Sequence, residues 1–324
     1  MENITVGDEN IGKTGILRDW KEMFAELYHA RELLYQMILR DIRVRYKQAA
    51  MGFAWAFFMP VLIVASGFLV KYAMAYVAGT SPDASSIAGM AVKAMIWAFF
   101  AGCVSFSSAT LTSNINLVTK IYFPREVLPM SAVFTQMFDI SIGSAGLAAF
   151  LFLVMGVPFS WSLLWLIPLV LMLVCFTMAI ALFISCANVF YRDVKYIVQI
   201  ILTFGIFFSP VFFEPIMFGP TGGRVMMLNP LSPIMEGMRL SVVGITPIEQ
   251  KAISPETEPA ESADGKISPS IRGGVNLLAT IRTAEGVTLW SPYYLLYSAL
   301  WAFPGLLLAW RNFHRLEFVL AEYI

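Results

Sequence analysis

Six long apolar stretches limit what this chain can fold into more than any other feature. A helix needs about 20 mostly apolar residues to cross the hydrocarbon core of a bilayer. Within that core each backbone amide must be bonded inside the protein, and a helix supplies those bonds locally. The stretches cover residues 52–77, 89–112, 127–155, 163–189, 196–213 and 293–310. The sequence therefore predicts an all-α integral membrane protein with six transmembrane helices.

The composition supports this fold class and argues against nucleic-acid binding and metal-dependent chemistry. The chain is 58% hydrophobic and 14% charged, whereas soluble domains carry about 25% charged residues. Its formal net charge is zero, so nothing points to nucleic acid as a partner. It has two histidines, His29 and His314, without metal-ligand spacing. We therefore expect no metal site, no cofactor bound by this chain, no catalytic residue and no enzyme activity.

Basic residues near the ends of the apolar stretches indicate the side of the membrane that each loop occupies. The run from Arg40 to Gln48 lies just before the first stretch, and Lys120 and Arg125 lie in the loop after the second. Lys and Arg in short loops mark the cytoplasmic side. The loops at 77–89 and 156–162 contain neither. Both termini are therefore predicted to be cytoplasmic.

The segments outside the six stretches have patterns of their own. Residues 17–38 alternate apolar and charged positions at helical spacing, which predicts an amphipathic helix at the membrane surface. Residues 214–244 are apolar but interrupted by prolines, which predicts two short re-entrant helices around Asn229-Pro230. Residues 246–274 predict a flexible external insert, and residues 275–289 a small hairpin.

These features divide the chain into four parts. Residues 1–50 form a cytoplasmic tail and the amphipathic helix, and residues 51–213 hold spans one to five. Residues 214–292 are external, and residues 293–324 hold span six and a cytoplasmic tail.

Few ionisable residues fall inside the predicted spans. Asp139 lies deep in the third span, where an unpaired carboxylate is costly. We favour a structural acid bonded to polar neighbours on the same segment, and a pore-facing or coupling acid stays open. The candidate neighbours are Ser131, Gln136, Ser141 and Ser144. Lys71 and Lys93 lie near span ends and are expected to extend towards the membrane surface.

Residues Gly7 to Thr14 match the phosphate-binding pattern GxxxxGK[ST]. A functional loop of this type follows a strand and opens a helix within a βαβ unit. Only six residues precede Gly7, and the apolar stretches leave no room for such a unit. We interpret the match as part of a polar tail that does not bind nucleotide.

Four motifs occur in order along the chain. They are residues 40–48 followed by Gly52, Trp55 and Pro60; residues 188–194, NVFYRDV; residues 209–211, SPV; and residues 228–231, LNPL. Together they resemble the motifs of ABC-2 type polysaccharide export permeases, the membrane subunits of O-antigen, capsule and teichoic-acid exporters. In that family the motifs mark the start of span one, the loop between spans four and five, the end of span five and the external re-entrant segment.

The resemblance implies a homodimer of six-span subunits in the bacterial inner membrane, with two copies of a separate cytoplasmic ATPase that uses ATP and Mg²⁺. It implies a continuous channel for a lipid-linked glycan, lined partly by spans one and five. Residues 17–38 match the family's interface helix in position, and Asn114 to Arg125 match its coupling helix. The external insert is longer than expected for the family. An ABC-2 permease for another lipid or a small molecule, or an ion-coupled carrier, stays open as the alternative.

Candidate functional residues form four groups. Aromatic faces suit sugar rings, and the channel candidates are Tyr46, Phe53, Trp55, Phe57, Phe204, Phe207, Phe208 and Phe212. Cations at the entrance could hold the pyrophosphate of the substrate or only anionic lipid; they are Arg43, Arg45 and Lys47. The ATPase-coupling candidates are Asn114, Lys120, Tyr122 and Arg125. The external-gate candidates are Asn229, Pro230, Glu236 and Arg239.

Overall fold

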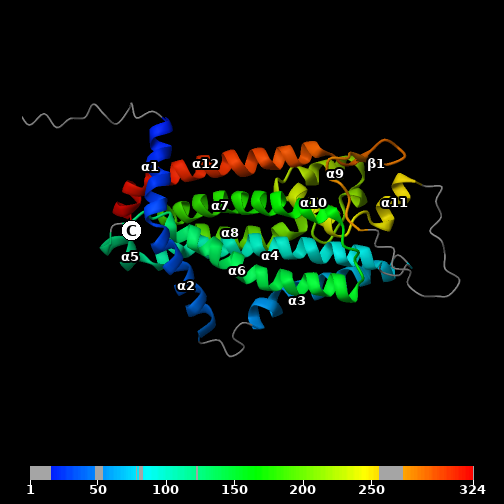
Figure 1. Ribbon diagram of the computed structural model, residues 1–324, viewed down its shortest axis with the longest axis horizontal. Helices are drawn as coiled ribbons and strands as arrows, with labels where there is room; N and C mark the ends of the chain where they lie inside the picture. The colour runs from blue at the N-terminus through cyan, green and yellow to red at the C-terminus, as the bar shows by residue number, and fades with distance from the viewer. Residues whose placement is uncertain are drawn as a thin grey trace, which may run out of the picture.

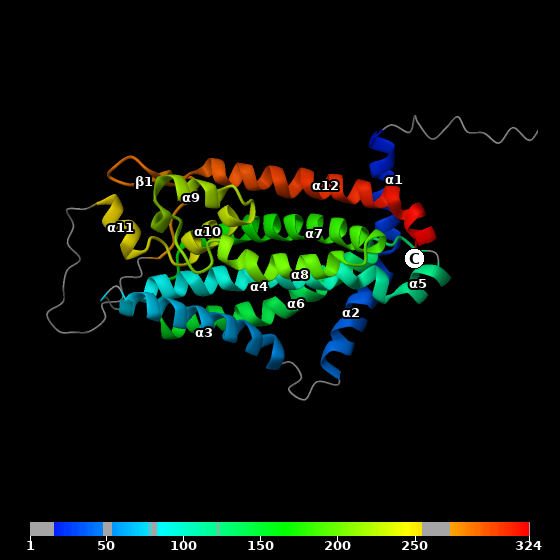
Figure 2. The ribbon, with the colours of Figure 1, turned by 180° about the vertical axis from the view of Figure 1, so that it is seen from behind.

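The computed structural model describes residues 16–47, 54–77, 79, 83–121, 123–254 and 273–323. Long helices lie side by side in a bundle, and shorter elements gather at its two ends (Figure 1; Figure 2). Within the described ranges, the one sheet is a two-stranded hairpin. The predicted all-α class is therefore confirmed. The phosphate-loop pattern at Gly7 to Thr14, Phe53 and Tyr122 lie outside the described residues, as do the side chains of Trp55 and Phe57.

Among the described residues, four helices are long and apolar enough to cross a membrane, by length and composition. They are α4 (Ala84–Ser113); α6 (Val127–Ala149) with its π-helical extension η1 (Phe150–Val154); η2 (Trp161–Trp165) continuing into α7 (Leu166–Phe190); and α12 (Pro292–Tyr323) up to Glu317. These helices coincide with the predicted second, third, fourth and sixth spans. Helix α12 runs past the predicted end of span six at Trp310, because no helix-breaking residue follows it.

The first and fifth apolar stretches form shorter apolar helices. The described part of the first is α3 (Ala54–Val77), with an apolar segment at Val64–Val77. The fifth is α8 (Val194–Gly205), which tightens into the 3₁₀ turn η3 (Ile206–Phe208). Both leave large apolar side chains exposed, including Leu69 on α3 and Ile201 on α8. They therefore lie at the outside of the bundle.

Helix α4 is the central element and contacts α3, α6, α7, α8 and α10. It begins after Asp83, whose carboxylate accepts a hydrogen bond from the backbone N–H of Ser86 at 3.0 Å. This cap satisfies an amide that the first turn of a helix leaves unbonded. Helix α12 packs along α7 on another side of the bundle.

The predicted amphipathic segment folds as two helices rather than one. Helix α1 (Ile16–His29) and helix α2 (Arg31–Lys47) cross one end of the bundle, beside the short helix α5 (Ile115–Lys120) (Figure 1). Backbone hydrogen bonds of 2.9 Å continue across Ala30, so the junction is a bend. The buried residues Met23, Ala30 and Met37 recur every seven positions and form the inward stripe. Helix α2 also carries the basic run, which is therefore helical up to Lys47.

The opposite end of the bundle is formed by the segment between α8 and α12. It contains η4 (Pro215–Phe218), α9 (Gly219–Met227), α10 (Leu231–Val242), α11 (Pro247–Ile253), β1 (Ile281–Arg282) and β2 (Thr288–Trp290). Two short helices thus flank Asn229-Pro230, and β1 pairs antiparallel with β2 as the hairpin prediction requires. Helix α11 corrects the prediction that the insert is flexible from residue 246, because Thr246 and Glu249 form a capping box that starts a helix. The remainder, residues 255–272, lies outside the described residues.

Candidate functional site

The basic run on α2 is divided between two faces of the helix. Arg43 and Lys47, four residues apart, are exposed on one face. Arg45 instead donates to Asp139 Oδ2 on α6 and to Gln136 Oε1 at 3.2 Å, and its guanidinium lies 4.2 Å from the ring centroid of Phe106. Burial lowers the pKa of Arg45, opposed by nearby groups that include Asp41. Arg45 is therefore half-buried and paired with α6, unlike the exposed Arg43 and Lys47.

Both oxygens of the Asp139 carboxylate have partners on α2. The Tyr46 hydroxyl donates to Oδ1 at 2.6 Å, and Arg45 occupies Oδ2. The predicted serine partners are wrong, because their hydroxyls donate to backbone carbonyls of α6 itself. The partners come instead from residues more than 90 positions away. Asp139 joins α2 to the middle of α6.

The predicted coupling segment projects from the same end of the bundle. Asn114 closes α4 by donating to Thr110 O at 2.8 Å. Helix α5 buries Val118 and exposes Lys120. Arg125 donates through its backbone N–H to Glu317 Oε1 at 3.0 Å, which joins the segment to α12.

A cavity of about 430 Å³ adjoins this segment, between the end of α4 and the α7–α8 turn. Asn188 holds the turn in place: its side chain donates to Thr112 Oγ1 at 3.4 Å and accepts from the backbone N–H of Lys195 at 3.1 Å. Arg192 and Lys195 line the cavity with positive charge. Sequence reasoning gave these residues no functional role, although the NVFYRDV motif was the signal that pointed to them.

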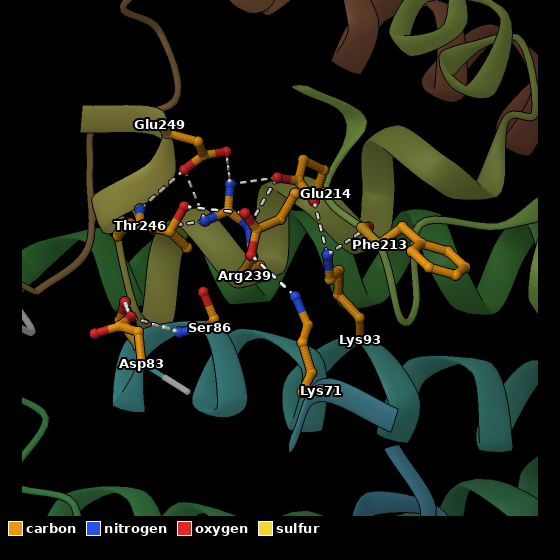
Figure 3. A network of polar contacts seen from close by, with 12 residues as sticks. Lys71, Asp83, Ser86, Lys93, Phe213, Glu214, Arg239, Thr246 and Glu249 are labelled. Atoms are coloured by element: carbon orange, nitrogen blue, oxygen red, sulfur yellow. Dashed lines mark hydrogen bonds and ion pairs between the residues drawn. The ribbon is translucent and has the colours of Figure 1, made fainter. Parts of the chain in front are cut away.

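A network of six buried charged side chains occupies the opposite end of the bundle (Figure 3). Arg239 on α10 is its centre, with bonds to Glu236 at 2.7 Å and to both oxygens of Glu249 at 2.7 and 3.1 Å. It also donates to Gly244 O at 2.8 Å. A planar guanidinium has five N–H donors, and here several carboxylate oxygens accept from it at once.

Two lysines connect this network to α4 and α3. Lys93 Nζ on α4 lies 3.6 Å from Glu236 Oε2 and donates to Phe213 O at 3.3 Å. Lys71 Nζ on α3 lies 3.4 Å from Glu214 Oε1, whose other oxygen accepts from Thr246. Both lysines are buried, so the prediction that they extend to the membrane surface is wrong. The segment that packs over this end of the bundle supplies Glu214 to Lys71 and Glu236 to Lys93, so the lysines pair with these acids instead of reaching solvent.

The predicted gate residues belong to two connected features. Glu236 and Arg239 lie in the charged network, on a helix whose twelve residues are all buried. Asn229 donates to Ser209 Oγ at 3.3 Å, which brings the SPV and LNPL motifs together. The Pro230 carbonyl accepts from Ser298 on α12 at 2.8 Å. The turn between α9 and α10 is thereby fixed to two other parts of the chain.

The aromatic channel candidates that the structure describes do not form one surface. Phe204, Phe207 and Phe208 on α8 and η3 are each more than half exposed. Phe212 is 7% exposed and packs within the core, with its ring 5.9 Å from that of Phe207. Tyr46 is held away from these residues by its bond to Asp139 at the middle of α6. Among the described channel candidates, Phe204, Phe207 and Phe208 therefore form one exposed aromatic edge along α8 and η3.

Long apolar helices joined by buried ion pairs define an integral membrane protein. Residues 32–243 match the family model of the ABC-2 type transporter. This match covers more than half of the chain, and the chain belongs to that family.

Curated relatives agree with this assignment. The chain is 28% identical over 217 residues to an O-antigen export system permease protein of Myxococcus xanthus, covering 65% of this chain and 80% of the relative. It is 27% identical over 209 residues to a protein of the same name from Klebsiella pneumoniae, covering 64% and 79%. The predicted resemblance to export permeases is confirmed.

Proposed function

We propose that this chain is the membrane subunit of an ATP-driven exporter that moves a lipid-linked, O-antigen-like polysaccharide from the cytoplasm across the inner membrane. The observation that carries the proposal is the similarity to the two O-antigen export permeases, which spans most of each relative. The contacts made by the four motifs support it. They join α2 to α6, the α7–α8 turn to α4, and the end of the fifth apolar segment to the α9–α10 turn.

In the proposed orientation, the end with α1, α2, α5 and the C-terminus faces the cytoplasm. Helix α3 and the α8–η3 segment complete six crossings, and α9 and α10 form the re-entrant pair. A second copy of the chain packs against the exposed outer helices. The basic loops around Lys120 and Arg192 support this orientation, because such residues favour the cytoplasmic side.

A separate ATPase subunit supplies the energy for transport, and two copies of it bind the cytoplasmic end of the bundle. The support is the exposed helix α5 beside a positively charged cavity lined by Arg192 and Lys195. Movement of the ATPase pushes on α5 and α1, and packed helices respond as near-rigid bodies. ATP and Mg²⁺ are bound by the partner and not by this chain.

The substrate pyrophosphate binds near Arg43 and Lys47, which are exposed on α2. Arg45 is not part of this proposed site, since Asp139 already neutralises it. The glycan passes over the exposed aromatic edge of α8, where sugar faces can stack. The α9–α10 turn at Asn229-Pro230 and the charged network behind it form the external gate.

Purification of the chain from its native membrane, with mass spectrometry of bound proteins, tests the energy source. We expect an ATPase subunit at equal stoichiometry. Deletion of the gene is expected to remove one surface glycan and to accumulate its lipid-linked form inside the cell. Loss of a different lipid, with all surface glycans intact, would identify another ABC-2 substrate.

The paired variant Arg43→Glu/Lys47→Glu tests the phosphate site. Export is expected to fall at least about tenfold, because two cations that hold phosphate become repulsive. The double variant Lys251→Glu/Arg282→Glu, which reverses two exposed cations at the opposite end of the bundle, is the matched control and should export normally. Normal export by a correctly inserted double variant would show that these cations only bind lipid or fix topology.

A further inference from the structure

A histidine and three carboxylates meet at the end of the bundle that carries α5. His314 and Glu317 come from α12, Glu126 from the residue before α6, and Glu26 from α1. His314 Nδ1 lies 3.8 Å from Glu126 Oε2, 3.7 Å from Glu317 Oε2 and 3.9 Å from Glu26 Oε2. Three segments far apart in sequence thus bring carboxylate oxygens around His314 Nδ1.

Glu126 is the unusual member of this cluster. Its side chain is fully buried, and Trp310 Nε1 donates to its Oε1 at 3.0 Å. Its Oε2 faces His314, and within the described residues it has no hydrogen-bond partner. A buried carboxylate oxygen without a partner carries a large desolvation cost. Trp310 therefore orients one oxygen while the other points, unsatisfied, into the cluster.

The spacing fits a metal ion. The ligand atoms of Glu126, His314 and Glu317 all lie within 4.8 Å of one another. Ligands bound to Zn²⁺ at about 2.1 Å in tetrahedral geometry are separated by about 3.4 Å. The two distances from His314 Nδ1 exceed this value by only a few tenths of an ångström. Small side-chain shifts would close the site.

Charge and donor type narrow the choice of ion. Three carboxylates lie within 4 Å of His314 Nδ1, and the Arg125 guanidinium bonds the backbone carbonyl of Glu317 rather than a carboxylate. A divalent cation would offset the negative charge of these carboxylates. An imidazole nitrogen among the donors favours a transition metal over Ca²⁺ or Mg²⁺, which prefer oxygen ligands. His314 and Glu26 are partly exposed, which leaves a route for the ion.

We propose that Glu126, His314 and Glu317 bind one Zn²⁺ ion, and that the Glu26 carboxylate, 3.9 Å from His314 Nδ1 but outside this group of three, moves in as the fourth ligand. The ion fastens the C-terminal helix to α1 and to the segment between α5 and α6. Sequence reasoning excluded a metal site because the ligands are not near one another in the chain. The proposal does not depend on the transported substrate.

Zinc binding by the purified full chain tests the proposal directly. The protein carries an affinity tag without histidine, is stripped with a chelator, and is titrated with Zn²⁺ against a chromophoric competitor. About one tightly bound Zn²⁺ per chain is expected, as for a single site of this kind. His314→Gln and Glu126→Gln should weaken binding at least about tenfold, and Trp310→Phe about tenfold through loss of the bond that orients Glu126.

The two histidines of the chain provide a matched control. His29→Gln removes an exposed histidine on α1 and should keep wild-type affinity. His314→Cys should also retain Zn²⁺, because a thiolate is a zinc ligand, which separates metal binding from a structural need for imidazole. Wild-type protein without a tight site, or unchanged affinity in folded His314→Gln, overturns the proposal. The cluster would then be an ion pair between protonated His314 and its carboxylates.

Discussion

At the scale of single residues, the buried charges of this permease join segments that are distant in sequence. Asp139 joins α6 to α2, and Arg239 joins α10 to α11. Removal of one member of a buried ion pair lowers the free energy of unfolding by more than the pair itself contributes, because the remaining buried charge has no partner. These pairs are therefore sensitive points in the fold.

Asp139→Asn is expected to lower the free energy of unfolding by about 3 kcal/mol, since Arg45 is left unpaired while keeping some contact with solvent. Unfolding of the purified protein in micelles measures the effect. Arg43→Gln, an exposed change on the same helix, should stay within about 0.5 kcal/mol of wild type. The apolar double variant Arg45→Met/Asp139→Leu should recover most of the loss. Equal stabilities for Asp139→Asn and the Arg43 control would contradict the pairing.

Arg239→Lys tests whether the guanidinium shape matters. A lysine ammonium cannot reach Glu236, Glu249 and the Gly244 carbonyl together, so about 1–3 kcal/mol of stability should be lost to unsatisfied buried groups. Arg282→Lys, on the exposed side of the hairpin, is the matched control and should be neutral. If both variants unfold alike, the network does not depend on a planar donor.

The sequence predicted which charged residues were unusual but not what they bind. Asp139 was identified from its depth in an apolar stretch, and its partners were sought locally. The actual partners depend on how α2 crosses the end of the bundle, which no periodicity in the sequence encodes. For the same reason the cluster at His314, Glu126 and Glu317 was missed.

At the scale of elements, α10 is the helix whose packing is most demanding. All of its twelve residues are buried, and the stem of Arg239 lies over Gly89 of α4. A Cβ atom at Gly89 would lie 2.9 Å from Arg239 Cδ. The absence of a side chain at that position lets the two helices approach with the arginine between them.

Gly89→Ala is expected to destabilise the protein by about 1–3 kcal/mol through overpacking against Arg239. Gly305→Ala is the matched control, because Gly305 also lies inside a long helix but has open space at its Cβ position. There the change should stabilise by up to about 1 kcal/mol. Opposite signs in thermal unfolding would support the close α4–α10 contact, whereas two stabilising changes would argue against it.

Element prediction succeeded where long apolar runs were uninterrupted and failed where local signals were overlooked. The spans at α4, α6, α7 and α12 follow directly from apolar length. Helix α11 was missed, although Thr246 and Glu249 are spaced as a helix start. The bend at Ala30 could not be foreseen, because the apolar stripe continues through it.

At the scale of the whole molecule, the segments divide between two ends. Helices α1, α2 and α5 and the C-terminus lie at one end, while α9, α11 and the hairpin lie at the other (Figure 2). The proposed orientation therefore makes opposite predictions for residues on the two ends.

Cysteine labelling in spheroplasts tests the orientation. Lys120→Cys on α5 should resist a membrane-impermeant maleimide until the cells are lysed, and Glu285→Cys in the hairpin should react at once. Both positions are exposed. The native cysteines Cys103 and Cys186 are buried, and the partly exposed Cys175 is replaced by serine in both variants to keep the background low. The reverse labelling pattern would invert the topology and remove the proposed site for the ATPase.

The burial of α10 bears on whether the protein conducts ions when it is not transporting substrate. Its acidic and basic groups are neutralised by one another, together with those of α3, α4 and α11, inside the far end of the bundle. Among the described residues of this network, three cations and three carboxylates balance one another. In the proposed orientation, an idle subunit should therefore leave the potential across its membrane intact.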